Sequence, residues 1–131
     1  MRITTKGFYA VEMLRALAMW KKSLPMTLAD IEDTLHIPRH YAERILLHLK
    51  RVGIAHSMRG NAGGWRLARK SGAITLSDIF HAVGEDITPW DDRPPRRAKK
   101  RPLMCPMHPV WQKLYRQNIA FFENTKLADF L

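Results

Sequence analysis

Three glycines and three arginines surround one tryptophan in the stretch HSMRGNAGGWRLAR, which runs from His56 to Arg69. Arg59 and Arg66 stand on either side of the glycines, and guanidinium groups suit phosphate oxygens or the negative potential of a narrow minor groove. Glycine allows positive φ and a close approach to another backbone. The stretch therefore indicates a hairpin tip that binds a polyanion. It is not a P-loop, because Trp65 follows the glycines where Gly-Lys-Ser/Thr would open a helix.

The charge balance of the whole chain agrees with a polyanionic partner. The sequence holds 22 Lys and Arg against 12 Asp and Glu, a formal net charge of +10. Such an excess attracts nucleic acid, although an ordinary basic surface gives the same total. The positions of the cations must therefore decide between the two.

Length, composition and cysteine content set the class of protein. The 131 residues are enough for one domain with a modest core. No apolar run is long enough to cross a bilayer, and the N-terminus MRITTKGFYA lacks the layout of a signal peptide. The single cysteine, Cys105, excludes an intrachain disulfide and suits a reducing compartment. We therefore expect a soluble cytoplasmic protein with no membrane partner.

Hydrophobic periodicity and capping residues predict three helices before the glycine-rich stretch. Thr5 is the candidate cap of a helix that ends near Trp20. Thr27 and Asp30 form an acidic variant of the capping box at the start of a short second helix. Pro38 suits the first turn of a third helix. The buried face of this third helix is predicted to hold Tyr41, Ile45, Leu46 and Leu49.

Two short helices joined by a few residues, with cations at the start of the second, are typical of a helix-turn-helix. The N-terminal turns of such a second helix enter a major groove, and here they carry Arg39, His40 and Arg44. Gly53 is predicted to end the helix, and IAHS and WRLA to form two strands around MRGNAGG. Another capped helix, TLSDIFHAV, begins at Thr75. This order predicts a mainly α fold with a small β-hairpin wing, a winged helix-turn-helix.

The same segments resemble the Rrf-type family of bacterial winged-helix regulators. The resemblance rests on MRITTKGFYAVEML, TLADIEDTLHIPRHYAERIL, RVGIAHSMRGNAGGWRLAR and ITLSDIFHAV, and the wing pattern RG-x-x-GG-aromatic-RLAR is its most specific part. It implies a sequence-specific transcriptional regulator, which we expect to be a repressor, that binds double-stranded DNA at an inverted-repeat operator as a homodimer. The positions that match the DNA contacts of the family are Arg39, His40, Tyr41, Glu43, Arg44 and Arg59. We add Arg66 for its charge on the predicted hairpin.

The C-terminal part predicts a long helix with more apolar surface than an isolated helix leaves in water. Its apolar residues at helical spacing are Trp111, Leu114, Tyr115, Ile119 and Phe122. The resemblance implies that this helix forms the dimer interface, and packing within the chain is the alternative. The predicted organisation is a winged helix-turn-helix domain (1–86), a basic proline-rich loop (87–107), and a dimerisation helix with a C-terminal segment (108–131).

The basic loop stands where iron–sulfur members of the family carry C-x5-C-x5-C-x2-H. Cys105 and His108 match the third cysteine and the histidine, but Arg93 and Lys99 occupy the first two cysteine positions. Cationic side chains oppose metal ligation where thiolates would supply it. We therefore expect no iron–sulfur cluster and no other cofactor. If a metal were bound, the candidate ligands would be Cys105, His108 and, from the first helix, Glu12.

Three interpretations of the segment MCPMH stay open. Its cysteine and histidine are structural remnants, or Cys105 is a thiol switch favoured by nearby cations, or the segment holds a soft metal or haem with ligands from both subunits. No enzyme is expected, because neither a glycine-rich oxyanion turn nor an acidic orienting residue accompanies Cys105. The alternative to a regulator is a winged-helix adaptor that binds a protein. Salt-dependent binding to random duplex DNA separates these two functions.

Overall fold

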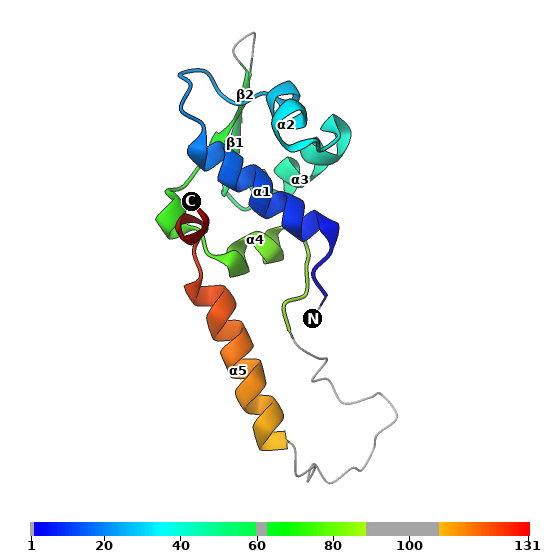
Figure 1. Cartoon of the computed structure of the whole chain (residues 1–131), viewed down its shortest axis with the longest axis vertical. Coiled ribbons are helices and arrows are strands. Elements are labelled where there is room, and N and C mark those ends of the chain that lie inside the picture. Colours follow the sequence, from blue (N-terminus) through cyan, green and yellow to red (C-terminus); the bar gives the residue numbers. More distant parts are fainter. Residues whose placement is uncertain (1, 60–62, 89–107) are drawn as a thin grey trace.

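The structure, a computed structural model, describes residues 2–59, 63–88 and 108–131 (Figure 1). The elements in chain order are α1 (Thr5–Met19), α2 (Leu28–Leu35), α3 (Arg39–Arg51), β1 (Ala55–Met58), β2 (Gly64–Leu67), the 3-10 helix η1 (Ser71–Ala73), α4 (Leu76–Ala82), α5 (His108–Asn124) and the 3-10 helix η2 (Leu127–Phe130). The described part is therefore mainly helical with one two-stranded antiparallel hairpin, which confirms the predicted fold class.

Helix α1 crosses the middle of the body, with α2, α3 and the hairpin on one side and α4 on the other (Figure 1). Its inward face consists of Ala10, Met13, Leu14 and Leu17, which are 0–6% exposed. The same core takes in residues of α2, α3, both strands, α4 and η2, together with Ile74. The winged helix is thus assembled around α1.

The first turn of α1 is capped differently from the prediction. Thr5 is the first helical residue and Thr4 is the N-cap, without a side-chain capping bond to the helix. The carboxylate of Glu85 instead accepts hydrogen bonds from the backbone N–H groups of Thr4 (3.3 Å) and Gly7 (3.2 Å), and from the Thr4 hydroxyl. An acceptor with negative charge satisfies the free N–H groups of a helix start. The prediction of Thr5 as the cap was wrong because the actual acceptor lies far along the chain.

The capping boxes of α2 and α4 agree with the sequence. Thr27 Oγ1 accepts from the Asp30 backbone N–H (3.1 Å), and the Asp30 carboxylate accepts from the Thr27 backbone N–H (2.9 Å). Thr75 and Asp78 repeat this arrangement at α4, with both distances 3.0 Å. Hydrogen bonds from the Thr27 backbone and hydroxyl hold the pKa of Asp30 below its usual value. Helix α2 ends at His36 in the left-handed conformation (φ 57°), which turns the chain towards α3.

The hairpin pairs Ala55 with Leu67 and Met58 with Gly64, so each strand is shifted by one residue from its predicted bounds. Met26 extends the hairpin on the β2 side, because its N–H and carbonyl exchange hydrogen bonds with Trp65 at 3.1 and 2.7 Å. A Cβ at Gly64 would lie 2.6 Å from the Met26 carbonyl oxygen. Glycine at this position therefore permits the close pairing of the segment before α2 with the wing.

The end of α5 packs on α4 through a second, smaller core that consists of Leu76, Phe80, Ile87 and Phe122. The Phe80 and Phe122 rings meet edge to face with centroids 5.5 Å apart. Backbone hydrogen bonds join Leu76 to Thr125 (2.8 Å) and Leu127 to Ile74 (2.9 Å). The rest of α5 extends away from the body (Figure 1). The segment 108–131 is thus attached to the winged helix at its C-terminal end.

Gly7 of α1 lies against the Phe80 ring of α4, and this contact generates a stability prediction. A Cβ at this position would lie 2.5 Å from Phe80 Cε1 and 3.3 Å from Glu85 Cγ. Because the Phe80 ring is itself buried, we expect Gly7→Ala to lower the free energy of unfolding by about 1–3 kcal/mol, although alanine favours helix. Urea denaturation at equal protein concentration measures the change.

The matched control is Gly72→Ala, since a Cβ there meets no atom within 4 Å. This variant should be as stable as the parent or up to about 1 kcal/mol more stable. A Gly7→Ala variant that unfolds at the same urea concentration as the Gly72→Ala variant would contradict the predicted crowding.

Candidate nucleic-acid interface

Helix α3 presents a polar face at its N-terminal end. Arg39, His40, Glu43 and Arg44 are all exposed there. Tyr41 is only half-exposed, because its ring packs edge to face on Tyr9 of α1 at 5.6 Å. Four of the five residues predicted on α3 as DNA contacts are therefore free of core packing, and Tyr41 links this face to α1.

The inner face of α3 holds the helix firmly against the core. Ala42, Ile45, Leu46 and Leu49 are at most 1% exposed. This confirms three of the four predicted buried residues, and Tyr41 is half-buried. At the C-terminal end, Gly53 ends the helix with φ 72°, and Lys50 Nζ donates a 2.7 Å hydrogen bond to Ser57 Oγ of β1. The exposed face of α3 and the hairpin therefore keep a fixed relation to each other.

Arg39 forms an ion pair with Glu32 of α2. The distance from Arg39 Nε to Glu32 Oε2 is 2.5 Å, and the two side chains are 59% and 41% exposed. An exposed pair of this kind contributes about 0–1 kcal/mol to stability. Arg39 can therefore exchange this carboxylate for another anion at little cost to the fold.

The two hairpin arginines have different environments. Arg59 is exposed and follows β1 directly. Arg66 of β2 donates hydrogen bonds to the carbonyl oxygens of Lys22 (3.4 Å) and Ser23 in the connection between α1 and α2. The structure thus engages Arg66 within the chain, where we had expected a DNA contact. Sequence spacing could not indicate this partner, since Arg66 and Ser23 are 43 positions apart.

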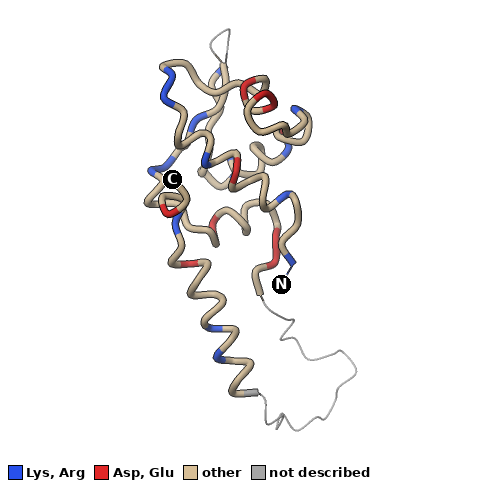
Figure 2. The backbone as a smooth tube through the Cα atoms, viewed as in Figure 1, with Lys and Arg blue, Asp and Glu red and all other residues tan. Residues whose placement is uncertain are grey.

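A groove of about 360 Å³ lies between the start of α2 and the hairpin. It is lined by the first residues of α2, by Arg39, and by hairpin residues that include Met58 and Gly63. At this end of the molecule Lys and Arg follow α3, the hairpin and the α1–α2 connection, whereas Asp and Glu gather on α2 (Figure 2). Arg39 supplies positive charge to the groove, as a surface that receives a polyanion requires.

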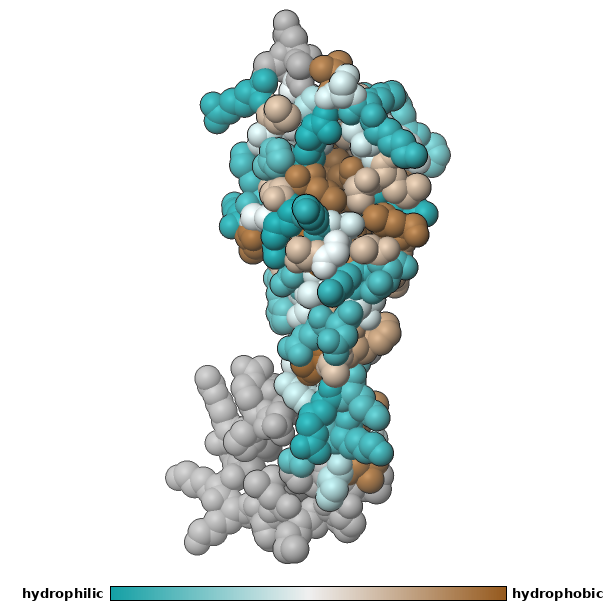
Figure 3. Space-filling model, turned by 90° about the vertical axis from the view of Figure 1, so that its left-hand side faces the viewer, coloured by the Kyte–Doolittle hydropathy of each residue, from teal (hydrophilic) through white to brown (hydrophobic). Residues whose placement is uncertain are grey.

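Helix α5 carries apolar side chains on two faces. The predicted dimer interface had included residues of both faces. Ile119 and Phe122 face the second core, and Phe122 is only 4% exposed, so it has little surface to offer a partner. Phe122 was predicted to lie in a dimer interface, and its burial in the second core leaves it little surface for that role. Trp111 (46%) and Leu114 (45%) are exposed, and Tyr115 is half-exposed. Figure 3 shows brown hydrophobic surface interrupting the hydrophilic surface of this part of the molecule.

Two further exposed residues of α5, Val110 (54%) and Phe121 (60%), were missed by the sequence analysis. Phe121 follows Leu114 by one heptad, a spacing that places both on one helix face. This signal was present in the sequence, but the neighbouring Phe122 fits helical spacing equally well. The choice between two adjacent phenylalanines depends on where the second core lies.

The residues that could ligate a metal do not fit an iron–sulfur cluster. Cys105, the one cysteine of the sequence, lies outside the described residues, as do Arg93 and Lys99. His108 is the first residue of α5, and exposed Glu12 lines a depression beside Thr34 of α2. Within residues 2–59, 63–88 and 108–131, no three His, Cys, Asp or Glu side chains could share a metal ion. One thiolate per chain falls short of the four that a cluster usually has.

The geometry is that of a winged helix with a basic wing, and comparison with known proteins gives its family. The model of the Rrf2 family, described as iron-dependent transcriptional regulators, matches residues 3–131. The chain belongs to the Rrf2 family. It is 32% identical over 133 residues to the regulator IscR of Vibrio cholerae, a match that covers 100% of this chain and 75% of the relative.

Solved structures of Rrf2-type regulators agree with the fold. CymR, the global cysteine regulator of B. subtilis, superposes with a TM-score of 0.76 at 26% identity, over 99% of this chain and 95% of that one. IscR of T. potens superposes with a TM-score of 0.73 at 26% identity, over 99% and 85% of the two chains. These matches confirm the predicted family and winged-helix fold.

As an Rrf2 protein, the chain is a DNA-binding transcriptional regulator and not an enzyme. The polar face of α3 and the hairpin are therefore the candidate DNA-binding surface. Among the residues that the structure describes, no helix combines the length and apolar character needed to span a membrane.

Proposed function

We propose that this Rrf2 regulator binds an inverted-repeat operator as a homodimer and represses transcription from it. The observation that carries the proposal is that the exposed N-terminal face of α3 and the exposed Arg59 of the hairpin are held on one rigid core. A helix with such a face fits a major groove, and an arginine at a hairpin tip fits the adjacent minor groove.

The exposed residues of α3 offer complementary chemistry to base edges. Arg44 suits the O6 and N7 atoms of guanine, and Glu43 suits the N4 amino group of cytosine. Arg39, released from Glu32, and His40 at the start of the helix suit phosphates. In this arrangement Tyr41 contributes by fixing the helix on α1, because its ring packs on Tyr9.

The homodimer is supported by the outward apolar face of α5. Val110, Leu114 and Phe121 are 45–60% exposed on a helix that extends from the body. A second copy related by a two-fold axis would cover both faces at once. The two α3 helices would then meet half-sites about one helical turn, or a multiple of it, apart. Occupation of such a site over a promoter gives repression.

Selection of genomic fragments by the purified protein tests this function. We expect the enriched fragments to share an inverted repeat, each half protected in a footprint, and the free protein to sediment as a dimer. A protein that does not bind duplex DNA at any salt concentration would instead support the adaptor function. Enriched sites without two-fold symmetry would contradict the homodimer.

Arg59→Ala tests the wing. Loss of a charged contact in the minor groove should weaken operator binding about fivefold to tenfold at fixed salt, about 1–1.5 kcal/mol, with base preference in the major groove retained. Fluorescence anisotropy with a labelled operator measures the affinity. Lys70→Ala removes an equal charge beside η1 and serves as the control. If the two variants bind equally well, Arg59 does not contact the operator.

We further propose that operator binding does not depend on an iron–sulfur cluster, because the donor set includes a single cysteine. Protein purified without oxygen should lack the visible absorption of a cluster, and its operator affinity should change less than twofold after treatment with a chelator. Cys105→Ser should bind the operator as the parent does. The opposite result is a brown protein with stoichiometric iron and sulfide that loses operator binding when the cluster is removed.

A further inference from the structure

The connection between α1 and α2 contains a basic loop, which we define as residues 21–25. Lys21, Lys22, Ser23 and Leu24 are exposed, whereas Pro25 and the following Met26 are buried. No helix or strand is formed within these residues. Three anchors nevertheless hold the loop, two by hydrogen bonds to its carbonyl oxygens and one at the residue that follows it.

The first anchor is Arg66, whose guanidinium donates to the carbonyl oxygens of Lys22 and Ser23. The second is Trp20, whose indole N–H donates to the Leu24 carbonyl oxygen at 2.8 Å. The third is the double hydrogen bond between Met26 and Trp65 of β2. A loop held in this way has lost most of its conformational freedom before any ligand arrives.

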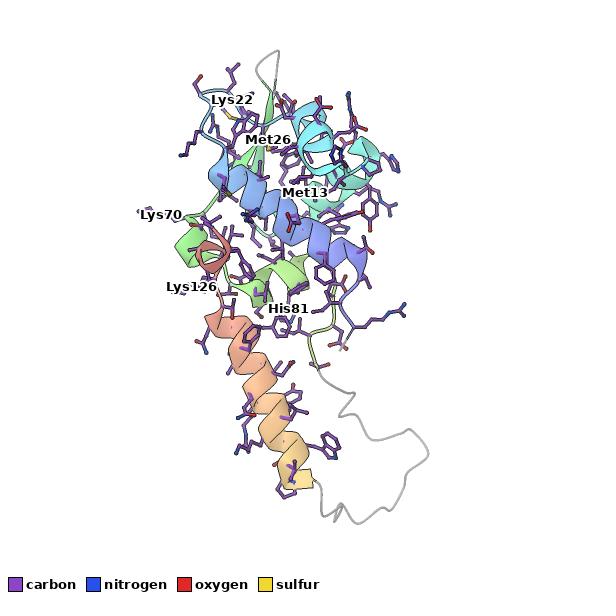
Figure 4. All side chains as sticks on the ribbon, viewed as in Figure 1. Met13, Lys22, Met26, Lys70, His81 and Lys126 are labelled. Atoms are coloured by element: carbon purple, nitrogen blue, oxygen red, sulfur yellow. The ribbon has the colours of Figure 1, made fainter. Side chains whose placement is uncertain are left out.

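The anchors place the basic loop beside the wing. Lys22, Leu24 and Pro25 line a cavity of about 210 Å³ together with Gly63, next to the hairpin tip. Since Met58 pairs with Gly64, Arg59 and Gly63 are the next residues of the two strands towards the tip. The loop therefore lies along the β2 edge, while Arg59 continues from β1. Figure 4 shows Lys22 beside the hairpin, and Lys70 and Lys126 nearer to α5.

The lysines of the loop are available to an anion. Lys22 Nζ lies 4.6 Å from the centroid of the Trp20 ring, an arrangement that orients the ammonium without neutralising it. Neither lysine forms an ion pair with a carboxylate of the residues that the structure describes. Asp30 lines the same cavity, and the charge of Lys22 contributes, after the hydrogen bonds from Thr27, to lowering the pKa of Asp30. The Asp30 carboxylate, however, accepts its hydrogen bonds from Thr27 and forms no ion pair with Lys22.

We propose that the basic loop is a second DNA-backbone contact, in which Lys21 and Lys22 bind phosphates at the outer border of the minor groove that receives Arg59. The proposal rests on the proposed operator binding. A minor groove is about 6 Å wide and is bordered by two phosphate backbones, one on each side of an inserted arginine. Helix α3 lies towards one border, and the basic loop, about one strand spacing beyond β2, lies towards the other. Lysine, a point charge on a flexible stem, suits such contacts.

In this arrangement Arg66 is a positioning residue for the loop. Its side chain donates to the loop carbonyls, and β2 holds its backbone opposite His56. Removal of the Arg66 side chain should therefore weaken the DNA contacts of Lys21 and Lys22. In a protein that already lacks both lysine side chains, the removal of Arg66 should weaken operator binding no further.

The salt dependence of operator binding tests the contact. Replacement of both loop lysines (Lys21→Ala with Lys22→Ala) should reduce the slope of log affinity against log salt by about 1.8, the value for two phosphates. The control Lys70→Ala with Lys126→Ala removes the same charge elsewhere on the surface and should leave the slope unchanged within about 0.5. Preference among operator bases should be the same in both variants, since no base contact is altered.

Arg66→Ala supplies the second measurement. It should lower the slope in the parent, but not in the protein that already lacks both loop lysines, and circular dichroism checks that each variant folds. In a phosphate-ethylation interference experiment, ethylation of two phosphates outside the wing contact should weaken operator binding by the parent. The same ethylation should not affect binding by the variant that lacks both loop lysines. If the parent and the variant without the loop lysines bind the operator with the same slope of log affinity against log salt, this inference is wrong and the proposed function stands. A parent that does not bind duplex DNA overturns the proposed function.

Discussion

The burial of α1 on several elements at once is the constraint on which the rest of the structure depends. Its core face meets α2, α3, α4, β2 and η2, so each of these elements takes its position from the same helix. At Gly7 the absence of a side chain lets the Phe80 ring approach the α1 backbone. A single rigid reference helix explains how two structures with little secondary structure of their own, the hairpin and the α1–α2 connection, are presented beside α3.

Two ionisable side chains form hydrogen bonds with backbone N–H and carbonyl groups that have no partner within a helix or strand. Glu85, only 6% exposed, accepts three hydrogen bonds at the start of α1, which compensates for the removal of its charge from water. Arg66 donates to carbonyls of the basic loop. In both cases the partner is far along the sequence, so the side chain joins two segments that packing alone would bring only near to each other. The charged side chain of Arg66 therefore helps to hold the DNA-binding end of the protein in place. The other cations of this end attract DNA.

The chain combines the DNA-binding architecture of its family with a different set of possible metal ligands. The family is described as iron-dependent, and this sequence has one cysteine and two cations at the positions of the family's first two cluster cysteines. The two cations, Arg93 and Lys99, lie outside the described residues. Among the described residues, the elements that position α3 and the wing pack on α1 and on the end of α5.

The sequence by itself determined the features that depend on residues three or four positions apart. The capping boxes at Thr27 and Thr75, the buried face of α3 and the end of that helix at Gly53 follow from local hydrogen bonding and helical period, and the wing follows from glycines between two alternating segments. Only the tertiary structure decided which distant groups meet. It assigned Glu85 to the start of α1, Arg66 to the basic loop, and Phe122 rather than Phe121 to the core. Each of these depends on the distance between elements after packing, which neither residue type nor spacing along the chain encodes.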